Sequence, residues 1–368
     1  MLKLFEVKGF KNFHEKISLD FSDVRDYRFN EHCVKDGFLK NVIIYGKNAS
    51  GKSNFSLALF DIAMHFVDNA FPIGMFGNYL NIACIDGEAE FHYVFQFGVD
   101  VVDYVYRKTS VKDITYEKLT LNDRLLVEKF YDESKKDDLS GLHELAPTLN
   151  FAFYKDGSII KYAISNAPLD SIHPLYVMMR YVMSMQFTAA FSARNYNPSD
   201  FHKLFANNQA LLPKFQELLN LAGIKDTIHI ETDVDGEKRL YSAPEYHPPG
   251  RVPFFQTASN GTFSLFVFFI YVLYFSNQNP SLLIIDEFDA FYHFELAENI
   301  VKKLGELPNT QVVLTSHNTN LLTNRIMRPD CLFILTPEKL TSFVNATDRE
   351  LREGHNLEKL YMSGEFDE

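Results

Sequence analysis

Residues 46–53 read Gly46-Lys47-Asn48-Ala49-Ser50-Gly51-Lys52-Ser53 and match the pattern G-x-x-x-x-G-K-[ST] at every fixed position. In such a loop the glycines let backbone N–H groups surround a phosphate, the lysine ammonium reaches the β and γ phosphates, and the serine hydroxyl ligates Mg²⁺. By ordinary residue frequencies the pattern arises by chance in about one chain in a hundred of this length. We therefore interpret it as a phosphate-binding loop, for which ATP and Mg²⁺ are the expected ligands.

The segments on either side of this loop favour an α/β sheet. The run Asn41-Val-Ile-Ile-Tyr45 is short and apolar, which is typical of a parallel strand covered on both faces. The stretch from Asn54 to Val67 has a helical pattern, and a helix that starts at the loop directs its first N–H groups at the phosphate. The residues predicted to bind the nucleotide here are Gly46, Lys47, Asn48, Ala49, Ser50, Gly51, Lys52, Ser53 and Asn54.

A second apolar run, Leu282-Leu-Ile-Ile-Asp286-Glu287, supplies the acidic half of such a site. Ligands collect at the carboxyl edge of a parallel sheet, so a carboxylate at the end of this strand is placed to hold the magnesium shell. Asp286 is the candidate for that role, together with Ser53. Glu287 is placed to orient and deprotonate a water molecule aimed at the γ phosphate. Alone, the pattern also fits an acidic turn after a strand, but beside the phosphate-binding loop it favours the catalytic interpretation.

A third apolar run, Val312-Val-Leu-Thr-Ser-His317, ends in small hydroxyl residues and a histidine. A neutral imidazole at this edge is suited to contact the γ phosphate or the attacking water. A lone histidine after a strand is usually structural, but its order after the two other motifs reverses that weighting. The predicted catalytic residues are therefore Glu287 and His317.

The strand and helix patterns predict that an α/β fold begins at the N-terminus, is interrupted, and resumes in the last third. Residues 1–131 and 254–368 form its two halves, and residues 132–253 form a mainly helical insertion with a hairpin. No heptad pattern persists, so no long coiled coil is expected. The expected elements are strands over 2–7, 16–21, 282–285, 311–315 and 331–335, an antiparallel meander over 88–126, helices over 174–190, 199–222, 263–275 and 294–304, and a hairpin over 227–242.

Composition narrows the class of protein. The chain has 368 residues, of which 46% are hydrophobic and 23% charged, so disordered and collagen-like chains are excluded. Its net charge of −12 argues against a protein that coats nucleic acid with a basic surface. The three cysteines are odd in number and far apart, which fits neither a disulfide framework nor a Cys-rich zinc site. With no signal-peptide pattern and no apolar run of about 18 residues, a cytoplasmic protein without a membrane anchor is expected.

The order of these motifs resembles an ABC-type ATPase head of the RecF, SMC and OLD lineage. The likeness covers about residues 1–66 and 254–366, and it is strongest to small stand-alone ATP/GTP phosphatases of bacterial defence islands. These include RloA-like and AbiL-like proteins, with the PARIS and Septu ATPase subunits as relatives. The tail Arg328-Pro-Asp330, followed by Arg349 through Tyr361-Met-Ser-Gly364, favours these stand-alone proteins over other heads.

The resemblance implies further site residues. Ser259-Asn260-Gly261-Thr262 would be the signature segment, which meets the γ phosphate of the opposite protomer, so Ser259, Asn260 and Gly261 join the predicted nucleotide-binding residues. Asp289 would lie in the D-loop and His317 would be the switch histidine. The segment departs from the Leu-Ser-Gly-Gly-Gln of transporters, which argues against a transporter motor. No Q-loop glutamine is assigned, because Gln96 lies in a predicted strand and Gln186 in a predicted helix.

Three functions stay open at this point. The first is an ATP-hydrolysing regulatory subunit of an anti-phage system, which forms a homodimer or higher oligomer on ATP and controls a separate effector, expected to be a nuclease. The second is a RecF-like DNA repair or recombination ATPase that binds DNA directly. The third is a scaffold that binds nucleotide without turnover. The motifs do not distinguish ATP from GTP, and no membrane partner is expected.

Overall fold

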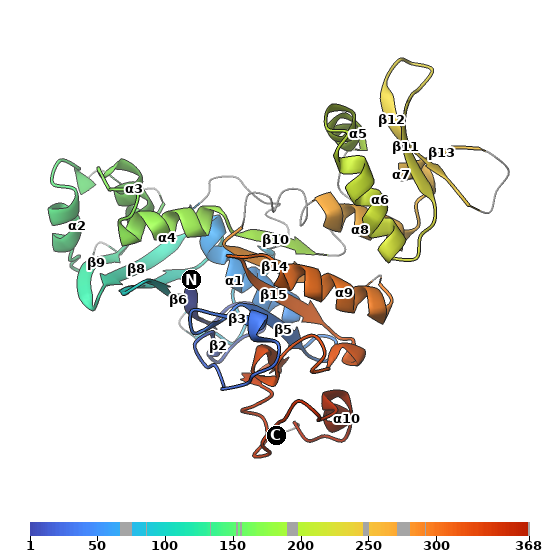
Figure 1. Ribbon diagram of the computed structural model, residues 1–368. Helices are drawn as coiled ribbons and strands as arrows, with labels where there is room; N and C mark the ends of the chain where they lie inside the picture. The colour runs from blue at the N-terminus through green and yellow to red at the C-terminus, as the bar shows by residue number, and fades with distance from the viewer. Residues whose placement is uncertain are drawn as a thin grey trace. The chain divides into compact units, whose positions relative to one another are not determined.

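The computed structural model describes residues 1–66, 76–85, 87–132, 134–151, 154, 157–189, 198–245, 250–270, 280–290 and 292–366 (Figure 1). The chain divides into two compact units. The first unit contains Met1–Phe187, Pro280–Asp286 and Leu304–Glu368, and the second contains Thr188–Asn279 and Glu287–Lys303. Over the ranges described, none of the helices is both long and apolar enough to cross a membrane.

One six-stranded sheet carries the phosphate-binding loop. β5, β14, β15 and β16 are parallel neighbours, and β17 is antiparallel to β16. Every residue of β5, β14 and β15 is buried, which explains why these strands are continuous apolar runs rather than alternating ones. The sheet order is β10 (Gln186–Ala189), β14 (Leu282–Asp286), β15 (Gln311–Ser316), β5 (Asn41–Tyr45), β16 (Leu332–Leu335) and β17 (Leu340–Ser342).

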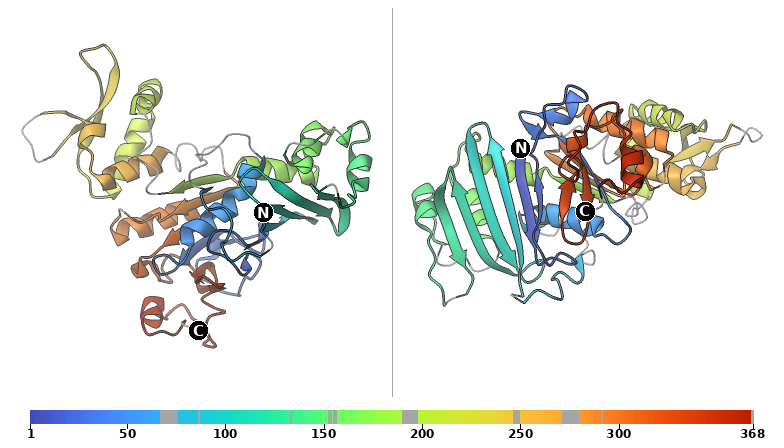
Figure 2. Two further views of the ribbon diagram at one scale, coloured as in Figure 1. Left: turned by 180° about the vertical axis from the view of Figure 1, so that it is seen from behind. Right: turned by 90° about the horizontal axis from the view of Figure 1, so that it is seen from below.

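A second six-stranded sheet is the predicted antiparallel meander, joined at one edge by the two N-terminal strands. The right view of Figure 2 shows its strands side by side. Along β7, Val102, Tyr104 and Tyr106 are buried while Asp103 and Val105 are partly exposed, as the two-residue period of a strand requires. The sheet order is β2 (Ile17–Asp20), β1 (Leu2–Lys8), β6 (Ala89–Phe97), β7 (Asp100–Lys108), β8 (Ile114–Leu121) and β9 (Arg124–Phe130).

Helix α1 (Lys52–Phe66) packs against both sheets, since it contacts β14 and β15 of the parallel sheet and β1 of the antiparallel one. It also packs against α4 (Pro174–Met183). A helix covered on all sides is apolar nearly all round, and Phe55, Leu59 and Ile62 of α1 are completely buried. The remaining elements of the first unit are α2 (Ser140–Leu145), α3 (Ile159–Asn166), α10 (Leu357–Met362), β3 (Val34–Lys35), β4 (Phe38–Leu39) and the 3₁₀ turns η1 (Glu31–Cys33), η7 (Thr319–Leu321) and η8 (Pro329–Cys331).

The second unit has its own aromatic core. The ring of Phe266 lies 5.3–5.8 Å from those of Phe205, Phe215 and Phe254, which come from three different helices. All four side chains are essentially buried, so this cluster joins the helices to one another. The elements are α5 (Pro198–Asn207), α6 (Leu211–Leu221), β11 (Thr227–Thr232), β12 (Lys238–Ala243), β13 (Val252–Pro253), α7 (Phe254–Thr257), α8 (Asn260–Phe268) and most of α9 (Phe294–Gly305).

The prediction of a helix over 174–190 is wrong for the second half of that range. The pattern over 174–190 predicts a single helix, but α4 ends at Met183, where the backbone N–H of Ser184 caps the carbonyls of the last turn. Residues 186–189 instead form strand β10 beside β14. Gln186 therefore lies in a strand. Pairing with the sheet outweighs the local helical pattern here, because Phe187 and Thr188 also favour strands.

Two further predictions differ in their boundaries. The stretch 199–222, predicted as helical, forms two helices that are separated at residues 208–210. In the predicted apolar helix 263–275, α8 runs to Phe268 and residues 271–275 lie outside the described part of the chain. The hairpin over 227–242 and the helix over 294–304 are confirmed within one residue.

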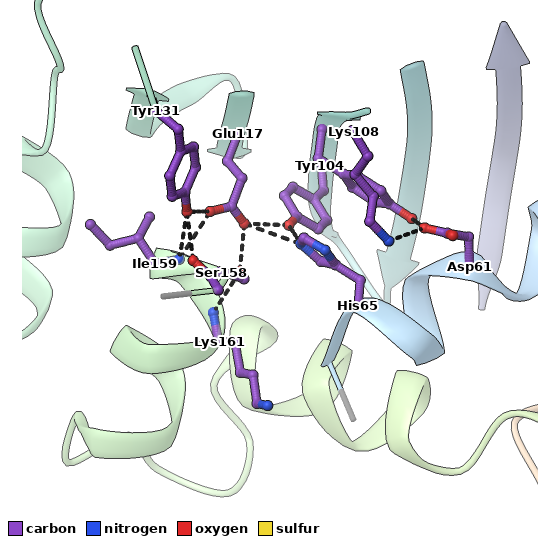
Figure 3. Close-up of polar contacts among 11 residues, drawn as sticks. Asp61, His65, Tyr104, Lys108, Glu117, Tyr131, Ser158, Ile159 and Lys161 are labelled. Carbon is purple, nitrogen blue, oxygen red and sulfur yellow. Dashed lines mark hydrogen bonds and ion pairs between the residues drawn. The ribbon is translucent and has the colours of Figure 1, made fainter. Parts of the chain in front are cut away.

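Buried polar contacts link the C-terminal half of α1 to the antiparallel sheet (Figure 3). Asp61 and Lys108 form a fully buried ion pair of 2.8 Å, and Asp61 also accepts hydrogen bonds from the hydroxyls of Tyr79 and Tyr106. A buried pair is costly to desolvate, so it persists only where further hydrogen bonds satisfy both charges. These contacts fix one face of α1 against β7.

One turn further along α1, His65 meets a second buried carboxylate. The hydroxyl of Tyr104 donates to Glu117 at 2.6 Å, and Nε2 of His65 lies 2.6 Å from that hydroxyl and 3.3 Å from Glu117. Glu117 also accepts hydrogen bonds from Ser158 and from the backbone N–H of Ile159, at the start of α3. One carboxylate thus joins α1, β7, β8 and α3.

This network makes stability depend on pH. Burial lowers the pKa of His65 below 6.5, despite the neighbouring Glu117. Burial alone would raise the pKa of Glu117, but the hydrogen bonds from His65, Ser158 and Tyr104 lower it overall. Both groups bind protons more readily in the unfolded chain, so stability falls as the pH drops, first below about 6.5 through His65 and then below about 4.5 through Glu117.

We expect urea denaturation to give a lower free energy of unfolding at pH 5.5 than at pH 7.5. The difference between the two pH values should be smaller in His65→Gln, because that variant lacks the buried group that resists protonation. His14→Gln is the control, since His14 is half-exposed. An unchanged difference in His65→Gln would contradict the assignment of acid sensitivity to this network.

Candidate nucleotide-binding site

The predicted loop connects the end of β5 to the start of α1, as the apolar run before it and the helical pattern after it indicate. Its backbone contains two residues with positive φ, Ala49 at 64° and Gly51 at 102°. At Gly46 a side chain is excluded by close packing, because an added Cβ would overlap the Ser50 hydroxyl and lie 2.8 Å from the Leu335 carbonyl oxygen. The glycines therefore allow the tight turn that a phosphate cradle requires.

A residue outside the motif, Asn12, supports this loop from the turn after β1. Its Oδ1 accepts a 2.6 Å hydrogen bond from the side chain of Asn54, and its Nδ2 lies 3.4 Å from the carbonyl oxygen of Ser50. A Cβ at Gly51 would overlap the Asn12 amide. Asn12 was not predicted, because nothing in the local sequence shows that the chain returns to the loop 38 residues later.

Gly51→Ala should remove nucleotide binding, since the new methyl group would displace Asn12 and the backbone has a φ that alanine avoids. Gly98→Ala is a matched control: Gly98 also has positive φ, at 63°, but a Cβ there meets nothing within 4 Å. We expect the control to lose roughly 1–2 kcal/mol of stability and to keep its nucleotide affinity. Titration with a fluorescent ATP analogue and thermal melts measure both. Equal affinity in the two variants would contradict the proposed cradle.

The ammonium of Lys52 is held above the loop. Its Nζ donates to the carbonyl oxygens of Gly46 at 2.7 Å and Lys47 at 3.2 Å. Only 6% of the surface of Lys52 is exposed. Residues 47–49 and Ser53 are exposed, so the loop opens toward solvent around this buried cation. The first turn of α1 and Lys52 thus present positive charge at the same place.

Asp286 lies at the end of β14 on the same edge of the sheet. Its Oδ1 accepts a 2.6 Å hydrogen bond from the hydroxyl of Thr315 on β15, and both residues are buried. β15 pairs with β5 so that Ser316 lies opposite Tyr45, directly before the loop. The ends of three adjacent parallel strands therefore bring together Asp286, Thr315 and the phosphate-binding loop. Thr315 as a partner of Asp286 was missed, although its place at the end of an apolar run was a signal.

His317 and Glu287 follow these strand ends. His317 comes directly after β15 and is exposed. Glu287 comes directly after β14, is partly exposed, and has a φ of 49°, which is a strained conformation for a residue with a side chain. Such strain persists where surrounding structure imposes it, and it concentrates at functional sites.

The predicted signature segment lies in the second unit, at the start of α8. Ser259 is the N-cap of this helix, since its hydroxyl oxygen accepts a 3.1 Å hydrogen bond from the backbone N–H of Thr262. Ser259 and Asn260 are exposed and Gly261 is partly exposed. The segment is therefore an accessible, capped helix N-terminus. Asp289 is buried.

The donor set fits a magnesium nucleotide. Phosphate oxygens would meet the glycine-lined loop and Lys52, and the buried hydroxyl of Ser50 has no hydrogen-bond partner among the described residues. Mg²⁺ prefers oxygen ligands and is commonly held by one or two protein oxygens plus phosphates. The exposed hydroxyl of Ser53 and the second oxygen of Asp286 meet that need.

The parallel sheet, the loop between β5 and α1, and Asp286 at the end of β14 define a P-loop NTPase fold. More particularly, the chain belongs to the AAA_21 family, described as "AAA domain, putative AbiEii toxin, Type IV TA system", whose model matches residues 42–323. No curated protein matches the chain.

Similar solved structures are heads of SMC proteins. They include the SMC head domain from Thermotoga maritima, with 15% identity and a TM-score of 0.43, covering 93% of this chain and 98% of that chain. An SmcHead bound to the C-winged helix domain of ScpA has 16% identity and a TM-score of 0.43, covering 93% and 97%. A Smc head domain with an extended coiled coil, bound to the C-terminal domain of ScpA derived from Pyrococcus furiosus, has 14% identity and a TM-score of 0.44, covering 93% and 96%.

Proposed function

We propose that this protein is the ATP-binding and hydrolysing regulatory subunit of a bacterial anti-phage defence system of the abortive-infection or restriction-island type. In this proposal two copies clamp ATP and control a separate effector, a nuclease. The observation that carries the ATPase part is the convergence of the phosphate-binding loop and Asp286 at one sheet edge, with the strained Glu287 next in the chain. The defence role is supported by the family description and by the resemblance to RloA-like, AbiL-like, PARIS and Septu ATPases.

The residues of the loop bind the triphosphate in this proposal. Lys52 exchanges its contacts with two loop carbonyls for contacts with the phosphates, which are charge-assisted and therefore stronger. Ser53 and Asp286 would hold Mg²⁺, which when bound would neutralise charge on the phosphates. Thr315 keeps Asp286 oriented by occupying one of its two oxygens.

Glu287 acts as the general base. Its side chain follows the metal ligand directly in the chain, so it orients a water molecule toward the γ phosphate and accepts its proton. The imposed φ of 49° fixes where the side chain leaves the backbone. His317, at the end of the adjacent strand, contacts the γ phosphate or the same water. A positioned general base contributes about 10²–10⁴-fold to the rate.

Ser259, Asn260 and Gly261 grip the γ phosphate of the partner copy. The exposed N-terminus of α8 offers backbone N–H groups and a positive helix dipole, which favour an anion. ATP bound by one copy then completes its contacts only on the other copy. Hydrolysis removes the phosphate that both copies hold, so the dimer is an ATP-dependent state to which an effector responds.

Light scattering tests this arrangement. We expect Glu287→Gln with ATP to form dimers, and Ser259→Arg in that background to remain monomeric while it still binds a fluorescent ATP analogue. Gln209→Arg, an equally exposed change in the same unit, is the control and should dimerise. Dimers in the Ser259→Arg variant, or monomers of Glu287→Gln with ATP bound, would refute the clamp. Co-purification with the product of the neighbouring gene tests the effector separately.

A further inference from the structure

A groove of about 510 Å³ lies on the first unit, and none of its lining residues belongs to the phosphate-binding loop. Its walls come from two segments that are about 320 residues apart in sequence, residues 25–29 and residues 349–353. We call it the arginine groove, because each wall contributes two arginines. The side chains that matter below are Arg25, Tyr27, Arg28, Phe29, Arg349 and Arg352.

A buried ion pair holds the first wall in place. Arg328 and Asp330 form a 2.6 Å pair, with 4% and 0% of their side chains exposed. Asp330 accepts a 2.8 Å hydrogen bond from the backbone N–H of Arg25, and Arg328 donates to the Arg25 carbonyl oxygen. Burying two charges is costly, so the contribution of this pair here is to fix the backbone of a surface loop.

A buried amide holds the second wall. Asn324, 9% exposed, donates from Nδ2 to the carbonyl oxygens of Arg352, Glu353 and His355, at 3.1, 2.9 and 3.2 Å. Both walls are thus attached to the short segment 324–330. The arginines stand on a backbone whose conformation is set before any ligand arrives, which lowers the entropic cost of binding.

The charges of the groove suit an anion. Four arginines line it, in a chain whose net charge is −12. Arg25 and Arg349 are paired with Asp23 and Glu365, so Arg28 and Arg352 are the arginines that face a ligand. The Arg352–Glu350 pair is 70% and 76% exposed, and ion pairs exposed to solvent contribute little to stability. A phosphate, which takes bidentate charge-assisted hydrogen bonds from arginine, displaces such a carboxylate readily. Arg28 is exposed and makes no ion pair within the described ranges.

Aromatic side chains alternate with the arginines of the first wall. The rings of Tyr27 and Phe29 lie 5.2 Å apart, and Arg328 covers the Tyr27 ring at 5.5 Å. Burial, followed by the charge of Asp330, raises the pKa of Tyr27 to about 12, so its ring stays neutral beside a phosphate. Aromatic faces beside arginines are the surfaces on which nucleobases stack.

We propose that the arginine groove binds a nucleotide unit, with its phosphate on Arg28 and Arg352 and its base against Phe29 and Tyr27. The unit belongs either to a free mononucleotide or to a single-stranded nucleic acid, which share this chemistry. A phosphorylated peptide would use the arginines but leave the aromatic rings without a partner, so the nucleotide is favoured. This site does not rest on the proposed ATPase function and is separate from the phosphate-binding loop.

The test uses the Lys52→Ala variant, in which nucleotide binding by the phosphate-binding loop is weakened. Anisotropy titrations with fluorescein-labelled dT12 and with a fluorescent AMP analogue, at 50 and 200 mM NaCl, measure the affinity. We expect saturable binding that weakens as salt rises, a loss of at least tenfold in Arg28→Ala/Arg352→Ala, and a loss of about tenfold in Phe29→Ala. Tight binding of dT12 alone identifies a strand, and equal binding of the AMP analogue identifies a mononucleotide.

Two controls keep the result specific. Lys302→Ala/Lys303→Ala removes two exposed positive charges elsewhere and should leave both affinities unchanged. With Lys52 intact, Arg28→Ala/Arg352→Ala should hydrolyse ATP like the wild type, so a failed ATPase assay and a failed groove are told apart. The proposal is overturned if neither probe binds, if the groove variants bind as well as the lysine control, or if only a phosphorylated peptide binds.

Discussion

Lys52→Ala should bind ATP about 10–100-fold more weakly than the wild type, and at ordinary concentrations its ATPase activity should disappear. The ammonium makes charge-assisted hydrogen bonds, each of which contributes about 1.5–3 kcal/mol. In the structure this group is already positioned over the loop by two carbonyl oxygens, so little rearrangement is needed before it meets a phosphate. Titration with a fluorescent ATP analogue measures the change.

Lys47→Ala is the matched control for this prediction. Lys47 belongs to the same loop and carries the same charge, but its side chain is exposed rather than buried within the loop. We expect it to lose less than threefold in affinity. If the two variants lose affinity equally, then general positive charge binds the nucleotide, and the specific position of Lys52 contributes nothing.

The second large effect is expected for Glu287→Gln, which should bind ATP normally and hydrolyse it roughly 10²–10⁴ times more slowly. Glutamine keeps the size of the side chain and its ability to orient water, but it does not accept the proton. A phosphate-release assay under single-turnover conditions measures the chemical step without interference from product release. The unchanged affinity separates this variant from Lys52→Ala.

Glu295→Gln removes the same charge from an exposed position of α9 and should leave hydrolysis unchanged. Wild-type turnover by Glu287→Gln would mean that another group takes the proton, and His317 would be the next residue to test. Glu287→Gly separates position from chemistry: it relieves the backbone strain at φ 49° but removes the base, so it should also be slow.

Much of the fold was predictable because several of its strands are mainly apolar. β5, β14 and β15 are wholly buried, and their central residues form apolar runs with polar residues only toward the ends of the strands. The end of α4 was not predictable in the same way, since residues 186–189 are compatible with either helix or strand. Their pairing partner, β14, lies about 95 residues further along the chain, so local sequence carries no trace of it.

The same distinction applies to the residues of the candidate site. The phosphate-binding loop is one continuous motif and Asp286 ends another. The structure places both at one sheet edge. Asn12 and Thr315 have no motif of their own, because each acts through a contact with a distant part of the chain. The nucleotide-binding, metal-binding and catalytic roles of all these residues, including Glu287, His317 and Ser259–Gly261, are proposals.

The double attachment of α1 has a mechanical consequence. A helix of 15 residues is roughly 22 Å long and resists bending, and here one end is the phosphate-binding loop while the other is bonded to β7 and β8 through Asp61 and His65. A small tilt of α1 at the nucleotide should therefore also move β7 and β8, to which the other end of the helix is bonded. The rate of amide hydrogen exchange in β8 should then depend on whether a nucleotide is bound at the loop.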